Sequence, residues 1–427
     1  MPDAGMSRRG FFRTFAGGAL GGMMLYAFPE EARARYVIAH DTAVAPDDEE
    51  FWAFVREQFP LRRDPIYLNN GTMGPSPFVV IDAVRAEAEV VDREGKYGGW
   101  DDVRPRIAGF VNAAVEEISL THNVTEGINI VASGLPLRRG DEVLVTDHEH
   151  AGNAIPWLAR ARRDGIVVKA VPLASTKSEI LNRINDAITG RTRVIAVPHV
   201  TCTIGQVLPG REISALGHDR GLWVMLDGAH TPGMIPCDVR ELGCDFFATC
   251  GHKWMMGPKG TGFLVVRREM LEVLEPSWVG GGVDAGWDVG RGTLAYRKDA
   301  HRFDFASQSA ALYVGLGAAV DFLYHLGMDN VARRGQGLAA LLRRELEKLG
   351  DRVTILTPAE PGASASILGF RLAGMSFDKL QPYLLEKHRI ITRMVPENGV
   401  NCNRISTHIY NSGEDVRRVA DAIAAIA

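Results

Sequence analysis

WVMLDGAHTPG (Trp223–Gly233) and CDFFATCGHKWMMGPKGTG (Cys244–Gly262) are the stretches that decide the fold of this chain. In each, a short apolar run leads to polar residues. Asp227 ends the first run, and Lys253 closely follows the second. Such runs are typical of buried strands in a parallel sheet, and open α/β sheets bind ligands beyond the carboxyl ends of their strands. We therefore expect Asp227 and Lys253 to meet at one edge of a parallel sheet.

A carboxylate and a lysine brought together in this way suit pyridoxal phosphate (PLP). The lysine can hold the cofactor covalently, and the carboxylate can keep the pyridine nitrogen protonated, so that the ring accepts electrons. Taken singly, each residue also has a structural explanation, because Asp often caps a helix and Lys often reaches out to water. Lys259 is a rival lysine in a turn-like loop. The chain has no GxxxxGK[ST] motif, so we do not expect nucleotide binding.

The order and spacing of these motifs resemble those of the class V aminotransferases, which include cysteine desulfurases, isopenicillin N epimerase and kynureninase. YLNNGTMG (Tyr67–Gly74), DGAH (Asp227–His230) and RISTHIYN (Arg404–Asn411) are most similar to the isopenicillin N epimerase-like branch. The resemblance implies an α/β protein of PLP-dependent transferase fold type I. It further implies a large, mostly parallel-sheet domain at 65–305 and a smaller α+β domain at 306–427, on which a helical segment at 47–64 packs.

The resemblance also assigns roles to residues of the site. Lys253 becomes the catalytic lysine and Asp227 the partner of the ring nitrogen. The other cofactor contacts it implies are Val124 (by its backbone) and Thr125 at the phosphate, His150 stacked on the ring, His230 at the phenolic oxygen, Cys250 and His252 near the phosphate, and Ser307 reaching the phosphate of a second subunit. Cys202 departs from the family, where an Asn binds the phenolic oxygen. Thr201 or Thr203 replaces that Asn, or the oxygen has one partner fewer.

Some of these residues have a local chemical reason as well. Thr125 stands at an expected helix N-terminus, where backbone N–H groups bind phosphate, although a simple Thr cap explains it equally well. His148 and His150 alternate on an expected strand and could be read as metal ligands. The chain has no HExxH motif and no evident third ligand, so we expect no metal site. Its five cysteines form no CxxC motif and indicate no disulfide framework.

Substrate recognition is expected to depend on arginine. By resemblance, Arg404 holds the α-carboxylate of an amino acid, for which a planar guanidinium is the natural partner. For Arg404 taken alone, a surface position is the ordinary alternative. Arg393 is a second candidate. The matching loop at the substrate entrance of the family contains Asn70, Gly71 and Thr72.

The N-terminal segment, residues 1–34, is predicted to be a targeting signal. SRRGFFR (Ser7–Arg13) fits the twin-arginine export pattern, with a basic amphipathic tail as the alternative. The weakly apolar run after it is too short and glycine-rich to span a bilayer comfortably, so no stable membrane anchor is expected. Twin-arginine systems export folded proteins, which suits an enzyme that binds its cofactor before it reaches the periplasm.

The 427 residues carry a net charge of −4 and show no basic patch, so nucleic acid is not an expected partner. We expect a homodimeric, exported PLP enzyme that acts on an amino-acid or peptidyl substrate by aminotransfer or epimerisation. Exported members of the resembled branch include enzymes that modify amino-acid side chains of periplasmic siderophore precursors. A C–S or C–C lyase is the alternative enzyme, but a desulfurase is disfavoured because 393–401 contains no cysteine. A cofactor-free exported binding protein is the non-enzyme alternative, and Lys253 argues against it.

Overall fold

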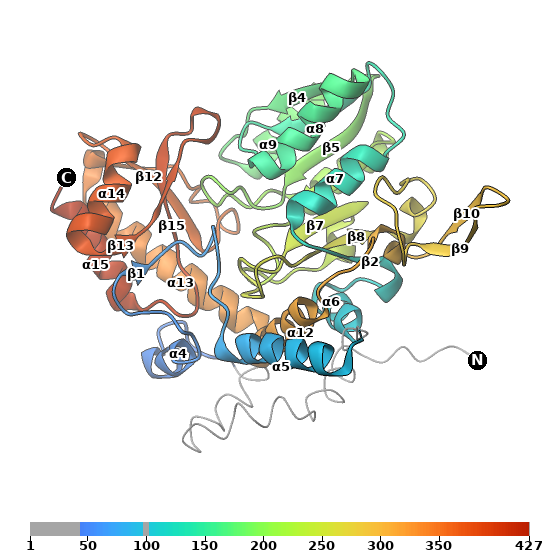
Figure 1. Cartoon of the computed structure of the whole chain (residues 1–427). Coiled ribbons are helices and arrows are strands. Elements are labelled where there is room, and N and C mark those ends of the chain that lie inside the picture. The colour runs from blue at the N-terminus through green and yellow to red at the C-terminus, as the bar shows by residue number, and fades with distance from the viewer. Residues whose placement is uncertain (1–42, 97–101, 427) are drawn as a thin grey trace.

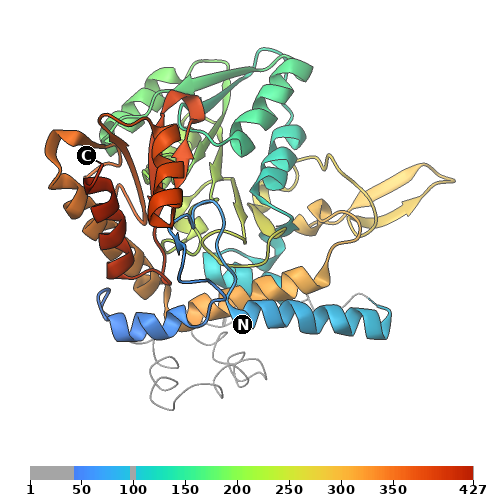
Figure 2. The same cartoon turned by 60° about the vertical axis from the view of Figure 1, so that its left-hand side comes forward.

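The computed structural model describes residues 43–96 and 102–426. The predicted export signal at residues 1–34 lies outside this range. Two lobes, each built on a β-sheet, stand side by side above a layer of helices (Figures 1 and 2). The α/β fold class predicted from the sequence is confirmed.

The larger lobe contains a seven-stranded sheet whose strands are mostly parallel. In spatial order they are β2 (Ile118–Thr121), β8 (Gly262–Val266), β7 (Phe246–Cys250), β6 (Trp223–Asp227), β5 (Thr192–Pro198), β3 (Glu142–Thr146) and β4 (Val167–Val171). β8 runs antiparallel to both of its neighbours, whereas the pairs from β7 to β4 are parallel. The carboxyl ends of β3, β5, β6 and β7 therefore share one edge of the sheet.

Both faces of this sheet are covered, which explains why its central strands are continuous apolar runs. In β6, Val224 and Leu226 enter one core with Ile213, whereas Met225 enters the opposite core with Trp157. The helices that cover the sheet and flank it are α7 (Val124–Gly134), α8 (Ala151–Asp164), α9 (Lys177–Ala187), α10 (Gly210–Asp219) and α11 (Val239–Leu242).

The smaller lobe has an antiparallel sheet and a core of its own. Its strands, in order, are β11 (Val353–Ile355), β12 (Ile367–Leu372), β15 (Cys402–Ser406) and β14 (Arg393–Val395), and its helices are α13 (Met328–Glu347), α14 (Phe377–His388) and α15 (Gly413–Ala424). β1 (Ile66–Tyr67) pairs in parallel with β13 (Ile390–Ile391), so the chain visits this lobe before it enters the larger one.

A helical layer joins the two lobes. α12 (Ala310–Leu326) lies along α5 (Phe78–Glu94) and also contacts α6 (Val103–Val111). Buried side chains of α12 belong to the same core as Val224 of the large sheet. The domain boundary expected near residue 306 stays a prediction. No single described helix is long and apolar enough to cross a bilayer, and only the bent pair of α12 and α13 meets that test by length and composition.

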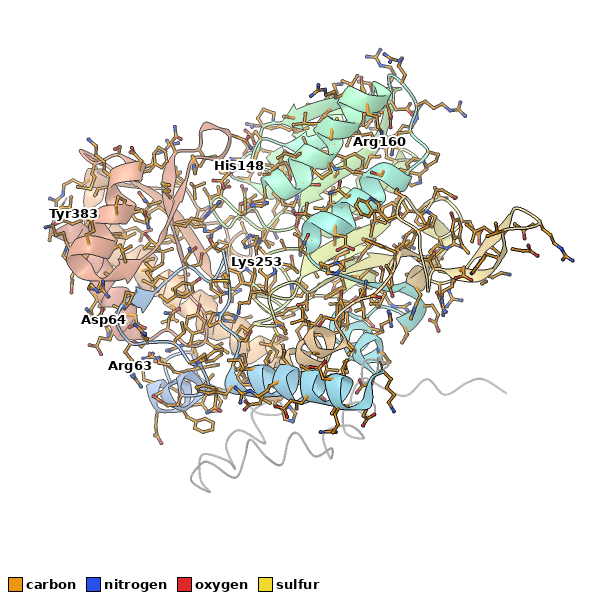
Figure 3. All side chains as sticks on the ribbon, in the orientation of Figure 1. Arg63, Asp64, His148, Arg160, Lys253 and Tyr383 are labelled. Atoms are coloured by element: carbon orange, nitrogen blue, oxygen red, sulfur yellow. The ribbon has the colours of Figure 1, made fainter. Side chains whose placement is uncertain are left out.

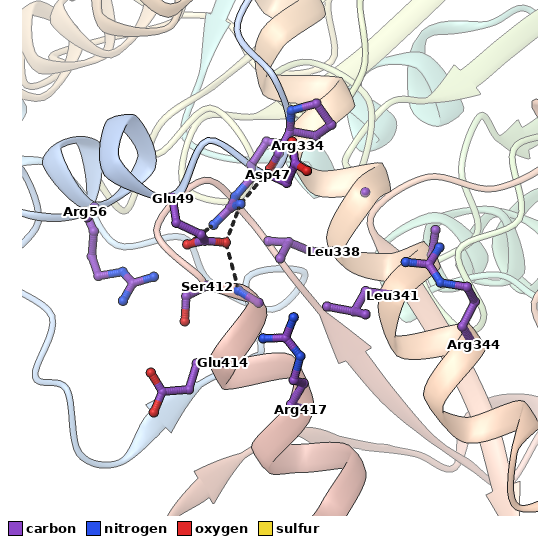
Figure 4. A pocket seen from close by; sticks show the side chains of 15 residues that line it. Asp47, Glu49, Arg56, Arg334, Leu338, Leu341, Arg344, Ser412, Glu414 and Arg417 are labelled. Atoms are coloured by element: carbon purple, nitrogen blue, oxygen red, sulfur yellow. Dashed lines mark hydrogen bonds and ion pairs between the residues drawn. The ribbon is translucent and has the colours of Figure 1, made fainter.

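Arg334 of α13 fastens the N-terminal helix α4 (Glu49–Arg56) to the smaller lobe. The arginine is only 1% exposed and donates hydrogen bonds to Glu49 at 2.8 Å, to the Pro46 carbonyl at 2.6 Å and to the Asn411 carbonyl at 2.6 Å. Figure 4 shows Arg334 and Glu49 at the wall of a cavity between α4, α13 and α15. These contacts hold α4 against α13, and the assignment of residues 47–64 to the smaller domain stays a prediction.

A hairpin of β9 (Asp284–Asp288) and β10 (Thr293–Tyr296) projects from the larger lobe (Figures 1 and 2). It exposes large apolar side chains, with Trp287 67% and Val289 83% accessible. Short 3₁₀ helices complete the described chain: η2 (Val115–Glu117), η3 (Arg268–Met270), η4 (Ala300–Phe303), η5 (Gly350–Arg352) and η6 (Glu397–Gly399).

Candidate active site

Asp227 and Lys253 lie at the carboxyl edge of the large sheet, as the sequence predicts. Asp227 is the last residue of β6 and Lys253 stands in the turn after β7, between the two lobes (Figure 3). Their side chains are almost completely buried. Burial raises the pKa of the Asp227 carboxyl, although the N–H of Ala229, 2.9 Å from Oδ1, and the charge of Lys253 favour its ionised form. A buried carboxylate with so little compensation is suited to a cationic partner.

The loop at residues 69–74 packs against the turn that carries Lys253. The amide N–H of Gly74 donates to the carbonyl oxygen of His252 at 2.7 Å. A Cβ at Gly74 would lie 1.9 Å from the Lys253 carbonyl oxygen, so only glycine permits this approach. The backbone on both sides of the lysine is therefore fixed, which leaves its side chain as the part that can move.

His230 links Lys253 to Trp254. Its Nε2 lies 3.3 Å from Nζ of Lys253, and its Nδ1 accepts a hydrogen bond from the indole N–H of Trp254 at 3.0 Å. The Trp254 carbonyl lies 3.0 Å from Nε2 of His408. Burial and the charge of Lys253 lower the pKa of His230, so the imidazole is neutral and carries its proton on Nε2. Sequence reasoning gave Trp254 no role, although it directly follows the lysine.

The start of α7 carries Val124 and Thr125, the residues predicted to bind the phosphate. The side chain of Asn123 caps the helix by accepting from the Glu126 amide at 3.0 Å. The amides of Val124 and Thr125 belong to the first turn, where a helix offers no internal acceptor. A Cβ on Gly152 would lie 2.7 Å from the Thr125 hydroxyl oxygen, so the N-termini of α7 and α8 adjoin each other.

His252 and Cys250 differ in what they can offer to a phosphate. Nδ1 of His252 is buried without a hydrogen-bond partner among the described residues, and burial lowers the pKa of this imidazole to about 4. The thiol of Cys250 points to the carbonyl oxygen of Ala229 at 3.9 Å. Burial raises the pKa of this thiol to about 11, so it stays protonated.

His150 caps α8 and presents a neutral ring. Its Nδ1 accepts from the Gly152 amide at 3.0 Å, and burial, followed by the charge of Lys253, lowers its pKa to about 4. The preceding Glu149 is completely buried and accepts from Thr146 and Asn153. Burial raises the pKa of Glu149 to about 8. A neutral, anchored imidazole is what the predicted stacking on a pyridine ring requires.

The turn after β5 holds the residues predicted to replace the missing Asn. The Thr201 hydroxyl accepts from the Gln206 amide at 3.0 Å, and the Thr203 hydroxyl lies 2.6 Å from Nδ1 of His148. Both hydroxyls thus have partners within the protein. Neither is favoured over the other as a ligand of the phenolic oxygen, and this assignment stays a prediction.

Arg404 of β15 is brought to the loop that was predicted to meet the substrate. Its guanidinium donates to the Cys202 carbonyl at 2.6 Å and, from Nη2, to the Thr72 hydroxyl at 3.0 Å and to Asn69 Oδ1 at 3.2 Å. A Cβ on Gly71 would lie 3.0 Å from the same Nη2. Asn70 differs from its neighbours, because its side chain is buried and accepts from the Tyr410 hydroxyl at 3.0 Å.

Arg393 and Ser307 are the remaining residues of the predicted site. Arg393 of β14 forms an ion pair with Glu397 of η6, a partner that sequence reasoning missed. Ser307 lies on an exposed stretch between η4 and α12. Its predicted contact with the phosphate of a second subunit stays a prediction.

The described residues fit PLP in three respects. Asp227 is an under-compensated carboxylate for the ring nitrogen. The amides at the start of α7 offer donors to a phosphate, and Nδ1 of His252 is buried without a hydrogen-bond partner among the described residues. Lys253 stands beside a neutral imidazole and can bind the cofactor covalently.

Comparisons with known proteins agree with this geometry. The family described as Aminotransferase class-V matches residues 90–419. A probable cysteine desulfurase of Methanothermobacter thermautotrophicus is 30% identical and covers 87% of this chain and 97% of its own. An isopenicillin N epimerase of Amycolatopsis lactamdurans is 32% identical and covers 87% of this chain and 98% of its own. A solved C-DES mutant with glycine covalently linked to the PLP cofactor is 27% identical, with a TM-score of 0.78 and coverage of 86% of this chain and 98% of its own.

Proposed function

Since this chain belongs to the class V aminotransferase family and is a PLP-dependent enzyme, we propose that it acts at the amino group and Cα of an amino-acid or peptidyl substrate, by aminotransfer or epimerisation. One observation carries the proposal. Arg404 is buried beside the lysine site, and every acceptor that the described residues offer it is neutral. A buried guanidinium without a carboxylate partner is suited to the α-carboxylate of an amino acid.

Each residue then has a defined task. When bound, PLP withdraws electrons from the Cα of an attached amino acid and so weakens the bonds at that carbon. Arg404 orients the substrate by its carboxylate, so that its amino group and Cα face Lys253. The amine of Lys253 moves the proton at Cα, and His230 donates from Nε2 beside it. Asp227 supplies the negative charge that keeps the pyridine nitrogen protonated.

The thiols near the site do not support a mechanism in which a cysteine of the enzyme accepts sulfur from the substrate. Cys402 is completely buried and its thiol points to the Thr203 carbonyl, and burial raises its pKa to about 12. Burial likewise raises the pKa of Cys202 to about 11. Neither thiol forms the thiolate that a sulfur-accepting cysteine needs near neutral pH. A C–S lyase that requires no such cysteine stays the second candidate, because a matching structure is named as a complex of a cystine C–S lyase with cysteine persulfide.

The reaction types can be separated in a single assay. The PLP-loaded enzyme is incubated in D₂O with L-amino acids and short peptides, with and without a 2-oxo acid. Epimerisation gives the opposite enantiomer with deuterium at Cα, and aminotransfer gives a 2-oxo acid in proportion to the acceptor supplied. Release of sulfide, persulfide or a shortened carbon skeleton would identify a lyase and overturn the proposal.

Assembly and location are part of the same proposal. A homodimer is supported by the projecting hairpin of β9 and β10, because an isolated two-stranded hairpin with exposed Trp287 and Val289 needs a covering partner to be stable. Export by the twin-arginine route to the periplasm is supported by SRRGFFR at residues 7–13. A siderophore precursor is then one class of peptidyl substrate to include in the assay.

A further inference from the structure

Two arginines, rather than one, face the substrate side of the smaller lobe. Arg393 on β14 lies directly opposite Arg404 on β15 in the antiparallel pair. Directly opposite residues project from the same face of a sheet, and like charges in that arrangement repel each other. The proximity is also seen in Arg404 itself, because burial and then the charge of Arg393 lower its pKa to about 9.

The two guanidiniums have different partners. Arg393 forms an ion pair with Glu397, four residues later in η6, and the two side chains are only 21% and 18% exposed. Arg404 binds a carbonyl, an amide oxygen and a hydroxyl, all of them neutral. The two guanidiniums and the Glu397 carboxylate together carry a net charge of +1. This positive charge is available to a substrate carboxylate.

We propose that Glu397 determines the charge specificity of the site, by occupying Arg393 so that a substrate with one carboxylate near its amino group is accepted and a dicarboxylic one is rejected. The inference rests on the proposed function, in which Arg404 binds the α-carboxylate. A second carboxylate would enter a buried region where it meets the charge of Glu397, whose Oε2 has no hydrogen-bond partner among the described residues, and where the charge of Arg393 is already balanced by Glu397. An unpaired charge in such a place carries a large desolvation cost.

Three aminooxy reagents test this without knowledge of the native substrate, because each condenses with the aldehyde carbon of PLP and changes its visible absorbance. O-methylhydroxylamine has no carboxylate, 2-aminooxypropionate has one and 2-aminooxysuccinate has two. Second-order rate constants are measured on the PLP-loaded wild type, on Glu397→Gln and on Glu386→Gln, which removes one charge from the exposed side of α14 in the same lobe.

In the wild type we expect 2-aminooxypropionate to react faster than both other reagents, and faster than the dicarboxylate by at least about tenfold, as a unit charge a few ångströms away in a partly buried site predicts. Glu397→Gln should bring that ratio close to 1 by accelerating the dicarboxylate, and Glu386→Gln should leave it unchanged.

Two results would overturn the inference: a wild type that does not discriminate between the one- and two-carboxylate reagents, or a Glu397→Gln variant that slows both equally, as a purely structural role predicts. Failure of the proposed function looks different. In that case the monocarboxylate would react no faster than O-methylhydroxylamine, in every variant.

Discussion

The indole N–H of Trp254 donates to Nδ1 of His230 at 3.0 Å, and this bond determines which nitrogen of the imidazole carries the proton. Since Nδ1 is an acceptor, Nε2 is the donor, and it lies 3.3 Å from the amine of Lys253. A fixed donor in this position orients the group that accepts from it. Trp254 is therefore a positioning residue that acts on the lysine through the histidine.

Replacing Trp254 with Phe keeps the buried ring and removes the N–H. We expect PLP to stay bound, and the midpoint of the pH titration of its visible absorbance to move upward, because the accepting group loses a fixed donor. Turnover should fall by about 10²-fold, within the range of a misplaced proton-transfer group. The control is Trp278→Phe, which changes a tryptophan that is 65% exposed. An unchanged midpoint in Trp254→Phe would show that the tryptophan only fills space.

Lys253 is expected to be the residue that binds PLP covalently. The purified protein should absorb visible light, and borohydride should remove the band and leave the reduced cofactor on the peptide that contains Lys253. Lys253→Ala should lower turnover by about 10²–10⁴-fold, the usual effect of losing a proton-transfer group. Lys259→Ala is the matched control, because this second lysine is exposed and donates to the Ser76 hydroxyl at 3.2 Å instead. Label on Lys259, or a Lys253→Ala variant with full activity, would contradict the assignment.

The central part of the fold could be predicted because it depends on local patterns. The apolar runs at β6 and β7 are buried on both faces, so strand and burial follow from composition, and their polar ends meet at the sheet edge as expected. Helix ends were harder to predict. A helical segment was expected at 47–64, but α4 ends at Arg56, shortly before Pro60, where the ring of proline disfavours helix.

The contacts that the sequence did not reveal depend on register or on the fold. Trp254 and His230 are 24 residues apart and meet only because β6 and β7 are neighbours. Arg393 faces Arg404 only through the pairing of β14 with β15, and no local pattern announces that register. The β9 strand, which reads DAGWD, lacks the β-branched run by which a strand is usually recognised, so its hairpin was not expected.

The twin-arginine prediction concerns Arg8 and Arg9. Changing both to Lys keeps the positive charge and removes the paired guanidiniums that define the signal. We expect the protein to remain in the cytoplasm with PLP bound, whereas the unchanged chain is recovered from the periplasm, as measured by fractionation of expressing cells. Arg13→Lys is the control, because it alters a basic residue outside the pair. Equal export of the double variant would leave the amphipathic-tail alternative in place.

The hairpin of β9 and β10 is expected to lie in the interface of a homodimer. Changing Trp287 and Val289 together to Lys should raise the concentration needed for dimerisation, because two apolar side chains that are 67% and 83% exposed in one chain would no longer be covered by the other. Sedimentation at several concentrations measures this. Ile155→Lys is the control, since it changes another exposed apolar side chain on α8. A wild type that is monomeric throughout would disprove the assembly.

Arg404 should act on substrate affinity rather than on the cofactor. Arg404→Lys keeps a positive charge but replaces the planar fork with a single ammonium, so we expect KM for a carboxylate substrate to rise about 10–100-fold, the effect of losing one or two charge-assisted hydrogen bonds. Bound PLP, measured by its absorbance, should stay constant. Arg404→Ala should raise KM further, and added guanidinium should partly restore activity only in that variant. Arg389→Ala is the control, since this arginine is exposed and pairs with Asp64. Loss of PLP from Arg404→Lys at unchanged KM would mean that the guanidinium serves the cofactor and that another group binds the carboxylate.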